Sequence, residues 1–296
     1  MQNIDAFDKQ FPNDDACKLF LAQLRWPDGV HCPRCNNDHV YKIAQPWKWQ
    51  CKVCQKNGYR FSVITGTIFQ DTKIPLKLWF KVGYLMLVSK KGISALQIHR
   101  VIFGEDSGSD YRTSWYMCHR WRAAMQNETF QQLVGEVEID ETYVGGKAKN
   151  RHGGHGKGGR GTAGKVAVIG AIARKGSVVA QVIENTDTET LEGFVTEAVS
   201  DKVSLVATDE HSGYAKLKKK GYPHQSVKHG QGEYVRGNVH TQNIDGFWSL
   251  IKRGIIGSFH HVSKDYLPLY VNEFAFRHNN RKNPHAFAQL IGTCGQ

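Results

Sequence analysis

Residues 137–146 read Val-Glu-Ile-Asp-Glu-Thr-Tyr-Val-Gly-Gly, and the apolar residues before Asp140 are typical of a β-strand. The sequence predicts three further strands, at 166–169, 177–183 and 204–207. We expect a helix at 190–199, between the third and fourth strands, and two longer helices at 241–256 and 264–280. Several strands followed by mixed helices predict an α/β domain over residues 134–290.

Acidic side chains occur where two of these strands end. Asp140 ends the first strand, and Asp209 ends Ser-Leu-Val-Ala-Thr-Asp at residues 204–209. An Asp after a strand is usually a turn residue or a helix cap. Acids at strand ends can also meet at one end of a sheet, where open α/β sheets bind ligands. These two readings stay open for each acid taken alone.

A third acid lies on the expected helix 241–256. Asp245 and Lys252 are seven residues apart, almost two helical turns, so they share one face of that helix. This pair suits an anionic backbone, because the acid can hold a metal ion while the Lys holds a phosphate. With Asp140 and Asp209 it predicts a site for two Mg²⁺ or Mn²⁺ ions, which favour oxygen ligands. Such an ion pair activates water or a 3′-hydroxyl for displacement at phosphorus.

Four of the seven cysteines form two C-x-x-C pairs, Cys32/Cys35 and Cys51/Cys54. Two such knuckles can hold one structural Zn²⁺ ion through four thiolates, and they predict a zinc ribbon over residues 30–62. The alternative, a redox C-x-x-C, needs one pair beside a βαβ unit rather than two matched pairs. Residues 1–29 are expected to form a helical lead-in that Asn13 helps to cap.

The charge of the chain favours a polyanionic partner. Its 39 Lys and Arg residues exceed its 27 Asp and Glu residues, which gives a net charge of +12. Residues 147–165 contain six Lys or Arg, seven Gly and no acid. This segment is either a flexible hairpin loop or a basic flap that orders on phosphates. Its basic residues are candidate DNA contacts: Lys147, Lys149, Arg151, Lys157 and Arg160. Arg253, beside Lys252, is another.

Residues 73–127 have helical periodicity and predict a helix-turn-helix region. One helix begins after Ser94, and a second runs near residues 111–125. On the second helix, Arg112, Arg120 and Arg122 are the expected DNA contacts. An ordinary helical linker with a solvated basic face is the alternative. No run of about 18 apolar residues occurs and the N-terminal residues lack a signal-peptide pattern, so we expect a cytoplasmic protein without a membrane span.

Taken together, these motifs resemble the DDE transposases of bacterial insertion sequences, and within them the insertion-sequence 1595 group, which has an ISXO2-like domain and a zinc ribbon. The motifs are the ribbon, residues 137–146, Asp-Glu-His-Ser-Gly-Tyr at 209–214 and His-Thr-Gln-Asn-Ile-Asp-Gly-Phe-Trp-Ser-Leu-Ile-Lys-Arg-Gly at 240–254. The first two acids of the family match Asp140 and Asp209, and the helical Lys matches Lys252. The third acid falls on Asp245, where members usually have Glu, and Gln242 or Asn243 is the alternative ligand.

The resemblance implies a ribonuclease-H-like catalytic domain that cleaves DNA at terminal inverted repeats and joins it to target DNA. It implies a homo-oligomer on double-stranded DNA and a nucleoid-associated protein of a bacterium. Two other functions stay open at this point. One is a catalytically impaired or domesticated transposase that only binds DNA, and the other is a ribonuclease-H-like nuclease.

Overall fold

The computed structural model describes residues 3–54, 57–104, 108–126, 131–146 and 164–295, and the chain divides into two compact units. The first unit comprises residues 1–125 and 280–296, and the second comprises residues 126–279. Residues 280–295 therefore pack with the N-terminal part of the chain, whereas the sequence predicts a catalytic domain that extends to residue 290. In the described residues, no helix combines the length and the hydropathy that a membrane span requires.

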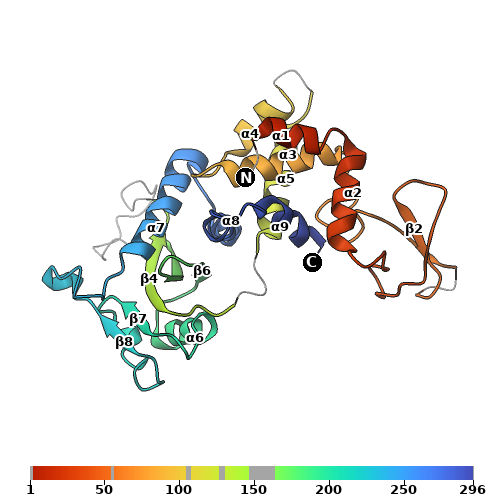
Figure 1. The fold of residues 1–296 in the computed structure, drawn as a ribbon. Helices are drawn as coiled ribbons and strands as arrows, with labels where there is room; N and C mark the ends of the chain where they lie inside the picture. The colour runs from red at the N-terminus through yellow and green to blue at the C-terminus, as the bar shows by residue number, and fades with distance from the viewer. Residues whose placement is uncertain (1–2, 55–56, 105–107, 127–130, 147–163, 296) are drawn as a thin grey trace. The chain divides into compact units, whose positions relative to one another are not determined.

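The first unit combines helices with a small antiparallel sheet (Figure 1). The helices are α1 (Ile4–Gln10), α2 (Asp14–Arg25), α3 (Leu76–Val88), α4 (Ala95–Ile102), α5 (Tyr111–Ala124) and α9 (Ala286–Gly292). The sheet has the order β1 (Val40–Lys42), β2 (Lys48–Cys51), β3 (Tyr59–Ser62). Asn13 caps α2 and Ser94 caps α4, as the sequence predicts, because each side chain accepts a backbone N–H of the first turn.

Aromatic side chains build the core of the helical part of this unit. Phe11 packs against Phe7 with ring centroids 5.0 Å apart and against Phe80 at 5.3 Å. Phe287 of α9 joins them, 5.6 Å from Phe7 and 5.7 Å from Phe80. These contacts explain why the C-terminal helix belongs to the first unit, since large rings contribute most of the apolar area that a small core can bury.

The second unit contains a five-stranded mixed sheet. Its strands are β4 (Glu136–Val144), β5 (Val166–Ala173), β6 (Val178–Ile183), β7 (Leu205–Thr208) and β8 (His224–Ser226), in the order β6-β5-β4-β7-β8. The first three strands along the chain are antiparallel, whereas β7 and β8 run parallel to β4. The predicted mixed α/β architecture is therefore confirmed. Strand β4 lies in the middle of the sheet and is paired on both sides.

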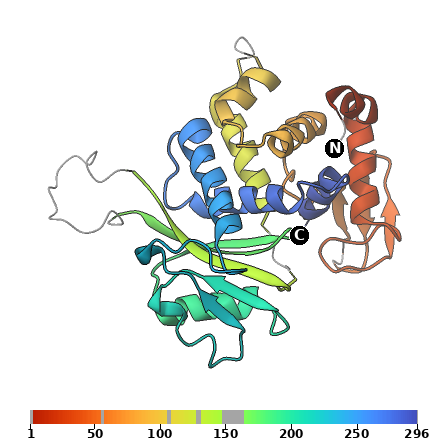
Figure 2. The ribbon, with the colours of Figure 1, turned by 60° about the vertical axis from the view of Figure 1, so that its left-hand side comes forward.

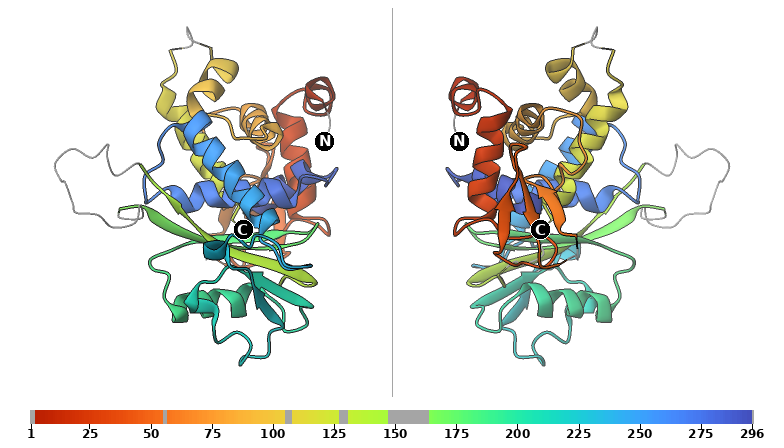
Figure 3. Two further views of the ribbon diagram at one scale, coloured as in Figure 1. Left: turned by 90° about the vertical axis from the view of Figure 1, so that its left-hand side faces the viewer. Right: turned by 90° about the vertical axis from the view of Figure 1, so that its right-hand side faces the viewer.

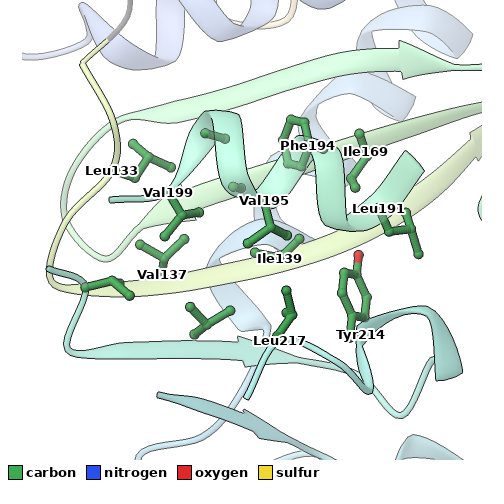
Figure 4. Close-up of a cluster of buried hydrophobic side chains, with 14 of the residues drawn as sticks. Leu133, Val137, Ile139, Ile169, Leu191, Phe194, Val195, Val199, Tyr214 and Leu217 are labelled. Atoms are coloured by element: carbon green, nitrogen blue, oxygen red, sulfur yellow. The ribbon is translucent and has the colours of Figure 1, made fainter. Parts of the chain in front are cut away.

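Helices cover both faces of this sheet (Figures 2 and 3). Helix α6 (Thr188–Ala198) covers one face, and α7 (Gln242–Gly254) and α8 (Leu267–Asn279) cover the other. Ile169 of β5 faces α6, whereas its neighbour Val168 faces α7 and α8. Burial on both faces explains the nearly continuous apolar sequence of β5. Figure 4 shows the α6 side, where Val195 packs against Val137 and Ile139 of β4.

Candidate functional site

The two cysteine pairs of the first unit converge around one point. The Sγ atoms of Cys32 and Cys54 are 3.8 Å apart, and those of Cys35 and Cys51 are 3.7 Å apart. All four sulfur atoms lie within 4.8 Å of one another. Thiolates bound at about 2.3 Å to a tetrahedral zinc ion lie about 3.8 Å apart. The four cysteines therefore fit a structural zinc ion, as their spacing predicts.

The ribbon needs such an ion because its own core is small. Its buried residues are Cys32, Cys51 and Phe61, against which Trp26 and Trp49 pack. So few apolar contacts cannot offset the conformational entropy of about 30 ordered residues, and metal binding supplies the missing free energy.

In the second unit, Asp140 lies in the middle of β4 and faces helix α7. The indole Nε1 of Trp248, on α7, donates a hydrogen bond of 3.0 Å to Asp140 Oδ2. Opposite Asp140 on β5 stands Gly170, whose missing side chain leaves room for the Trp248 ring. A Cβ atom at Gly170 would lie 2.6 Å from that ring. Strand, helix and glycine together hold Asp140 in one orientation.

Asp209 directly follows β7, the parallel neighbour of β4. Glu138 pairs with Ala207, so Asp209 continues beside Asp140 on the adjacent strand. The backbone N–H of His211 donates a hydrogen bond of 2.9 Å to Asp209 Oδ1 and shapes the turn that follows. The sheet therefore brings the first two predicted acids to neighbouring positions.

The loop after Asp209 is fastened to β4 by Tyr214. The buried hydroxyl of Tyr214 donates a hydrogen bond to Glu141 Oε1, next to Asp140 in the chain but on the opposite face of the sheet. Burial raises the pKa of Glu141, while the hydrogen bond from Tyr214 acts to lower it.

Asp245 and Lys252 lie on α7, and both are exposed. Asp245 accepts a hydrogen bond of 3.3 Å from the Thr241 hydroxyl. Asp245 also stands one turn before Trp248, the residue that contacts Asp140. Helix α7 therefore exposes both Asp245 and Lys252 to solvent, while its contact through Trp248 holds it against β4.

Asp140, Asp209 and Asp245 are here called the carboxylate triad. The pKa of the Asp140 carboxyl is raised to about 8. Burial is the largest cause, and the negative charges of three neighbouring acids add to it: Glu141, Asp209 and Asp245. Like charges raise a carboxyl pKa only when they are close to it, so the site concentrates negative charge that a cation would neutralise.

The triad is nevertheless more open than the cysteine site. Among the described residues, only the four cysteines place one ligand atom each within 4.8 Å of all the others. The Nδ2 of Asn243, one alternative third ligand, donates a hydrogen bond of 2.7 Å to Glu138, which holds this amide against the buried carboxylate. Gln242, the other alternative, is exposed at the first turn of α7.

The predicted DNA-contact residues fall into three groups. Arg112 is 90% exposed on α5, and Arg120 lies over the ring of Tyr116 at 5.4 Å on the same helix. Lys252 and Arg253 are exposed on α7. Arg122 is only 1% exposed, so the expectation that it contacts DNA is wrong for this structure. The candidates on the basic segment lie outside the described residues: Lys147, Lys149, Arg151, Lys157 and Arg160.

Sequence reasoning missed two side chains that organise the site, Glu138 and Trp248. Glu138 is fully buried in β4, although it is a carboxylate. The available signal was a charged residue between Val137 and Ile139, in a strand that helices cover on both faces.

Two family models match this chain. Residues 132–279 match the ISXO2-like transposase domain, and residues 12–57 match the transposase zinc-ribbon domain. A protein of Halobacterium salinarum described as an uncharacterized protein in transposable element ISH50 is 28% identical over 286 residues, which cover 93% of this chain and 94% of that protein. A chain of the cryo-EM structure of the simian T-cell lymphotropic virus intasome with PP2A regulatory subunit B56 gamma aligns over 68% of both chains at 13% identity. Its TM-score of 0.30 is too low to carry an argument.

Proposed function

Because the chain belongs to the ISXO2-like transposases of the insertion-sequence 1595 group, we propose that it binds terminal inverted repeats and catalyses metal-dependent DNA cleavage and strand transfer. The observation that carries this proposal is the arrangement of the carboxylate triad: Asp209 continues beside Asp140 on the adjacent strand, and Asp245 stands one turn before Trp248, whose indole N–H contacts Asp140. Three acids that repel one another around a partly open position are what a divalent-metal site for phosphoryl transfer requires.

The order of the strands supports a ribonuclease-H-like catalytic domain. Three antiparallel strands, one helix and two strands parallel to the first follow one another along the chain, and the first strand lies at the centre. Its Asp140 and the end of the fourth strand then come together beside helix α7. Each member of the triad therefore lies on a different element: Asp140 on β4, Asp209 after β7 and Asp245 on α7.

The residues present fit Mg²⁺ or Mn²⁺, since the triad offers carboxylate oxygens only. When bound, two such ions activate the attacking oxygen and stabilise the leaving oxygen. Asp140, Asp209 and Asp245 are the residues that would hold these ions.

Other side chains of the second unit orient the acids and bind the DNA backbone. Trp248 orients Asp140 through its indole N–H, and the exposed Lys252 is placed to hold a phosphate of the DNA backbone. Asp245 and Lys252 occupy one face of α7, so a bound strand would contact both. Water attacks phosphorus in the cleavage step, and a 3′-hydroxyl attacks it in the strand-transfer step. Neither step needs a covalent bond between enzyme and DNA.

We assign DNA recognition to the first unit, through the zinc ribbon and a helix-turn-helix formed by α4 and α5. Arg112 is the exposed cation of α5 that phosphates or bases could reach, whereas the half-buried Arg120 already donates hydrogen bonds to the Tyr116 hydroxyl and the Thr67 carbonyl. Transposition requires two ends to be held together, so we propose a homo-oligomer on DNA.

The test is strand transfer of an oligonucleotide that carries the inverted repeat flanking the gene, with Mg²⁺ or Mn²⁺. We expect Asp140→Asn and Asp209→Asn to abolish cleavage and joining while DNA affinity stays nearly unchanged, because each change removes a metal ligand and no phosphate contact. Asp265→Asn, an exposed acid of the same unit, is the matched control and should stay fully active.

Other outcomes identify the alternative functions. Normal binding of the repeat by the unmodified protein without joining at any metal concentration would indicate an impaired or domesticated transposase. Cleavage without joining would indicate a nuclease. Retained cutting by Asp140→Asn would remove that residue from the site.

A further inference from the structure

Glu138 is a fully buried acid that precedes Asp140 by two residues on β4. Side chains two residues apart on a strand point to the same face, so Glu138 and Asp140 both face helix α7. A buried carboxylate is costly unless donors surround it, and donors surround this one.

The donors come from the first turn of α7. The backbone N–H of Asn243 donates a hydrogen bond of 2.7 Å to Glu138 Oε2, and the backbone N–H of Ile244 donates one of 3.2 Å to the same oxygen. The Nδ2 of Asn243 donates a further bond of 2.7 Å to Oε1. A strand residue more than 100 positions away in the sequence therefore caps this helix.

Glu138 replaces the usual helix cap. Thr241 stands at the N-cap position, but its side chain makes no capping hydrogen bond. The first backbone N–H groups of a helix have no partner inside it, and they carry the positive end of its dipole. The Glu138 carboxylate of β4 accepts hydrogen bonds from these N–H groups, and its negative charge stabilises the positive end of the dipole.

Arg174, which directly follows β5, balances the charge of Glu138 and also contacts the residue before α7. Its Nε donates a hydrogen bond of 2.8 Å to Glu138 Oε1, and its Nη2 donates one of 3.3 Å to the carbonyl of His240, just before α7. His240 Nδ1 lies 3.1 Å from Oε1, although without the alignment of a hydrogen bond.

The geometry points to Glu138 as a positioning residue that fixes the start of α7 on β4 and thereby sets Asp245 against Asp140. Apolar contacts of α7 with the sheet are not directional and would tolerate a small slide or rotation of the helix. Hydrogen bonds to two consecutive backbone N–H groups define both the axial position and the rotation. This inference rests on the proposed function, because it concerns the geometry of the carboxylate triad.

The test compares Glu138→Gln with Glu136→Gln. Both oxygens of Glu138 accept hydrogen bonds, so an amide would place its own N–H groups against donors. Glu136 lies on the same face of β4 and also pairs with Arg174, but none of its hydrogen bonds reaches the first turn of α7. It is therefore a control for loss of the Arg174 ion pair alone.

Two measurements are made on the full-length protein. The first is the NMR resonance of the Trp248 indole N–H, assigned with Trp248→Phe, which reports the position of α7 against Asp140 without metal or DNA. The second is the rate of strand transfer over a range of Mn²⁺ concentrations. We expect Glu138→Gln to shift the resonance and to slow strand transfer by about 10- to 100-fold, the usual effect of removing a residue that orients a metal ligand. Glu136→Gln should leave the rate within about twofold.

A folded Glu138→Gln protein with an unchanged resonance and a normal rate would overturn the inference, even if the protein were less stable. If this variant does not fold, Asn243→Ala removes one donor to Glu138 and keeps the backbone bond. The resonance should then shift in the same direction, and no shift would again overturn the inference. If the unmodified protein joins no DNA, the proposed function fails, whereas the Trp248 resonance still decides the role of Glu138.

Discussion

Three acids of strand β4 have three different environments, although they occupy positions 138, 140 and 141. Glu138 is buried and surrounded by donors, Asp140 receives the indole N–H of Trp248, and Glu141 receives the hydroxyl of Tyr214 on the other face. Each environment suits a different task. Among the three, Asp140 is the acid that continues beside Asp209 and contacts helix α7, which carries Asp245, so we propose it as the metal ligand.

Gly170 provides a residue-scale test of how Asp140 is held. Gly170→Ala should destabilise the protein by about 1–3 kcal/mol, because the new Cβ would overlap the Trp248 ring. It should also slow strand transfer, since the ring would be pushed away from Asp140. Chemical denaturation and the strand-transfer assay measure these effects.

The matched control is Gly193→Ala, at an open position inside helix α6. It should stabilise the protein by about 0.5–1 kcal/mol, because alanine loses less backbone entropy in a helix. Equal stability of the two alanine variants would contradict the proposed packing of Trp248 over Gly170.

Individual residues were predicted where chemistry and spacing coincide, and missed where tertiary contacts decide. The triad stays a prediction, made from acids at expected strand ends and from the offset between Asp245 and Lys252, and Asp140 lies inside β4 rather than at its end. Glu138 was missed because its donors lie on other elements, far along the chain. Arg122 was assigned to DNA from its charge, although it follows the buried Cys118 by one helical turn and so lies on the inward face of α5.

At the scale of elements, locally encoded features are the ones that sequence predicts best. Helices α2 and α4 begin at the capping residues expected for them, because a cap depends on the neighbouring residues alone. Strand β4 extends to Val144, beyond the expected segment 137–140, because pairing with β5 continues past Asp140. Strand pairing is a property of the whole sheet and leaves no local mark in the sequence.

The zinc ribbon gives a prediction at the element scale. Cys32→Ser should remove the bound zinc and unfold β1–β3, because the apolar core of the ribbon is too small to fold without metal. Binding to the terminal repeat should weaken, while the carboxylate triad is untouched. Elemental analysis and a DNA-binding titration measure the two effects.

Cys17→Ala is the control, because Cys17 is buried in α2 and does not belong to the cysteine cluster. It should retain one zinc ion per chain. A Cys32→Ser protein that still held stoichiometric zinc would show that the ion binds elsewhere.

At the scale of the whole molecule, the net charge bears on the proposed binding of DNA. Under the proposed function, a charge of +12 would attract DNA without regard to its sequence. Specific recognition would then fall to the ribbon and α4–α5 of the first unit, and the chemistry to the carboxylate triad of the second unit. Affinity and catalysis should therefore be separable by mutation.

The salt dependence of DNA binding tests the proposed contacts between basic side chains and phosphates. The logarithm of the DNA association constant should fall linearly with the logarithm of salt concentration, with a slope of about −0.9 per phosphate contact. Arg112→Ala should make the slope shallower by about one unit, because it removes one exposed cation.

Arg112→Lys is the control for this change. It keeps the charge and should keep the slope, even if affinity falls through loss of the forked guanidinium. An unchanged slope for Arg112→Ala would exclude a phosphate contact at this position. Fluorescence anisotropy at several salt concentrations measures all three proteins.

Because β4 is the central strand, deletion of a single residue from it should be enough to disrupt the candidate site. Loss of one codon between those for Glu138 and Asp140 would reverse which face every later side chain of the strand occupies, because side chains alternate with a period of two. Asp140 would then point to the α6 side, into an apolar layer. Under the proposed function, such an in-frame deletion would leave the ribbon sequence intact and remove the chemistry, so its product would compete with intact copies for the same DNA ends.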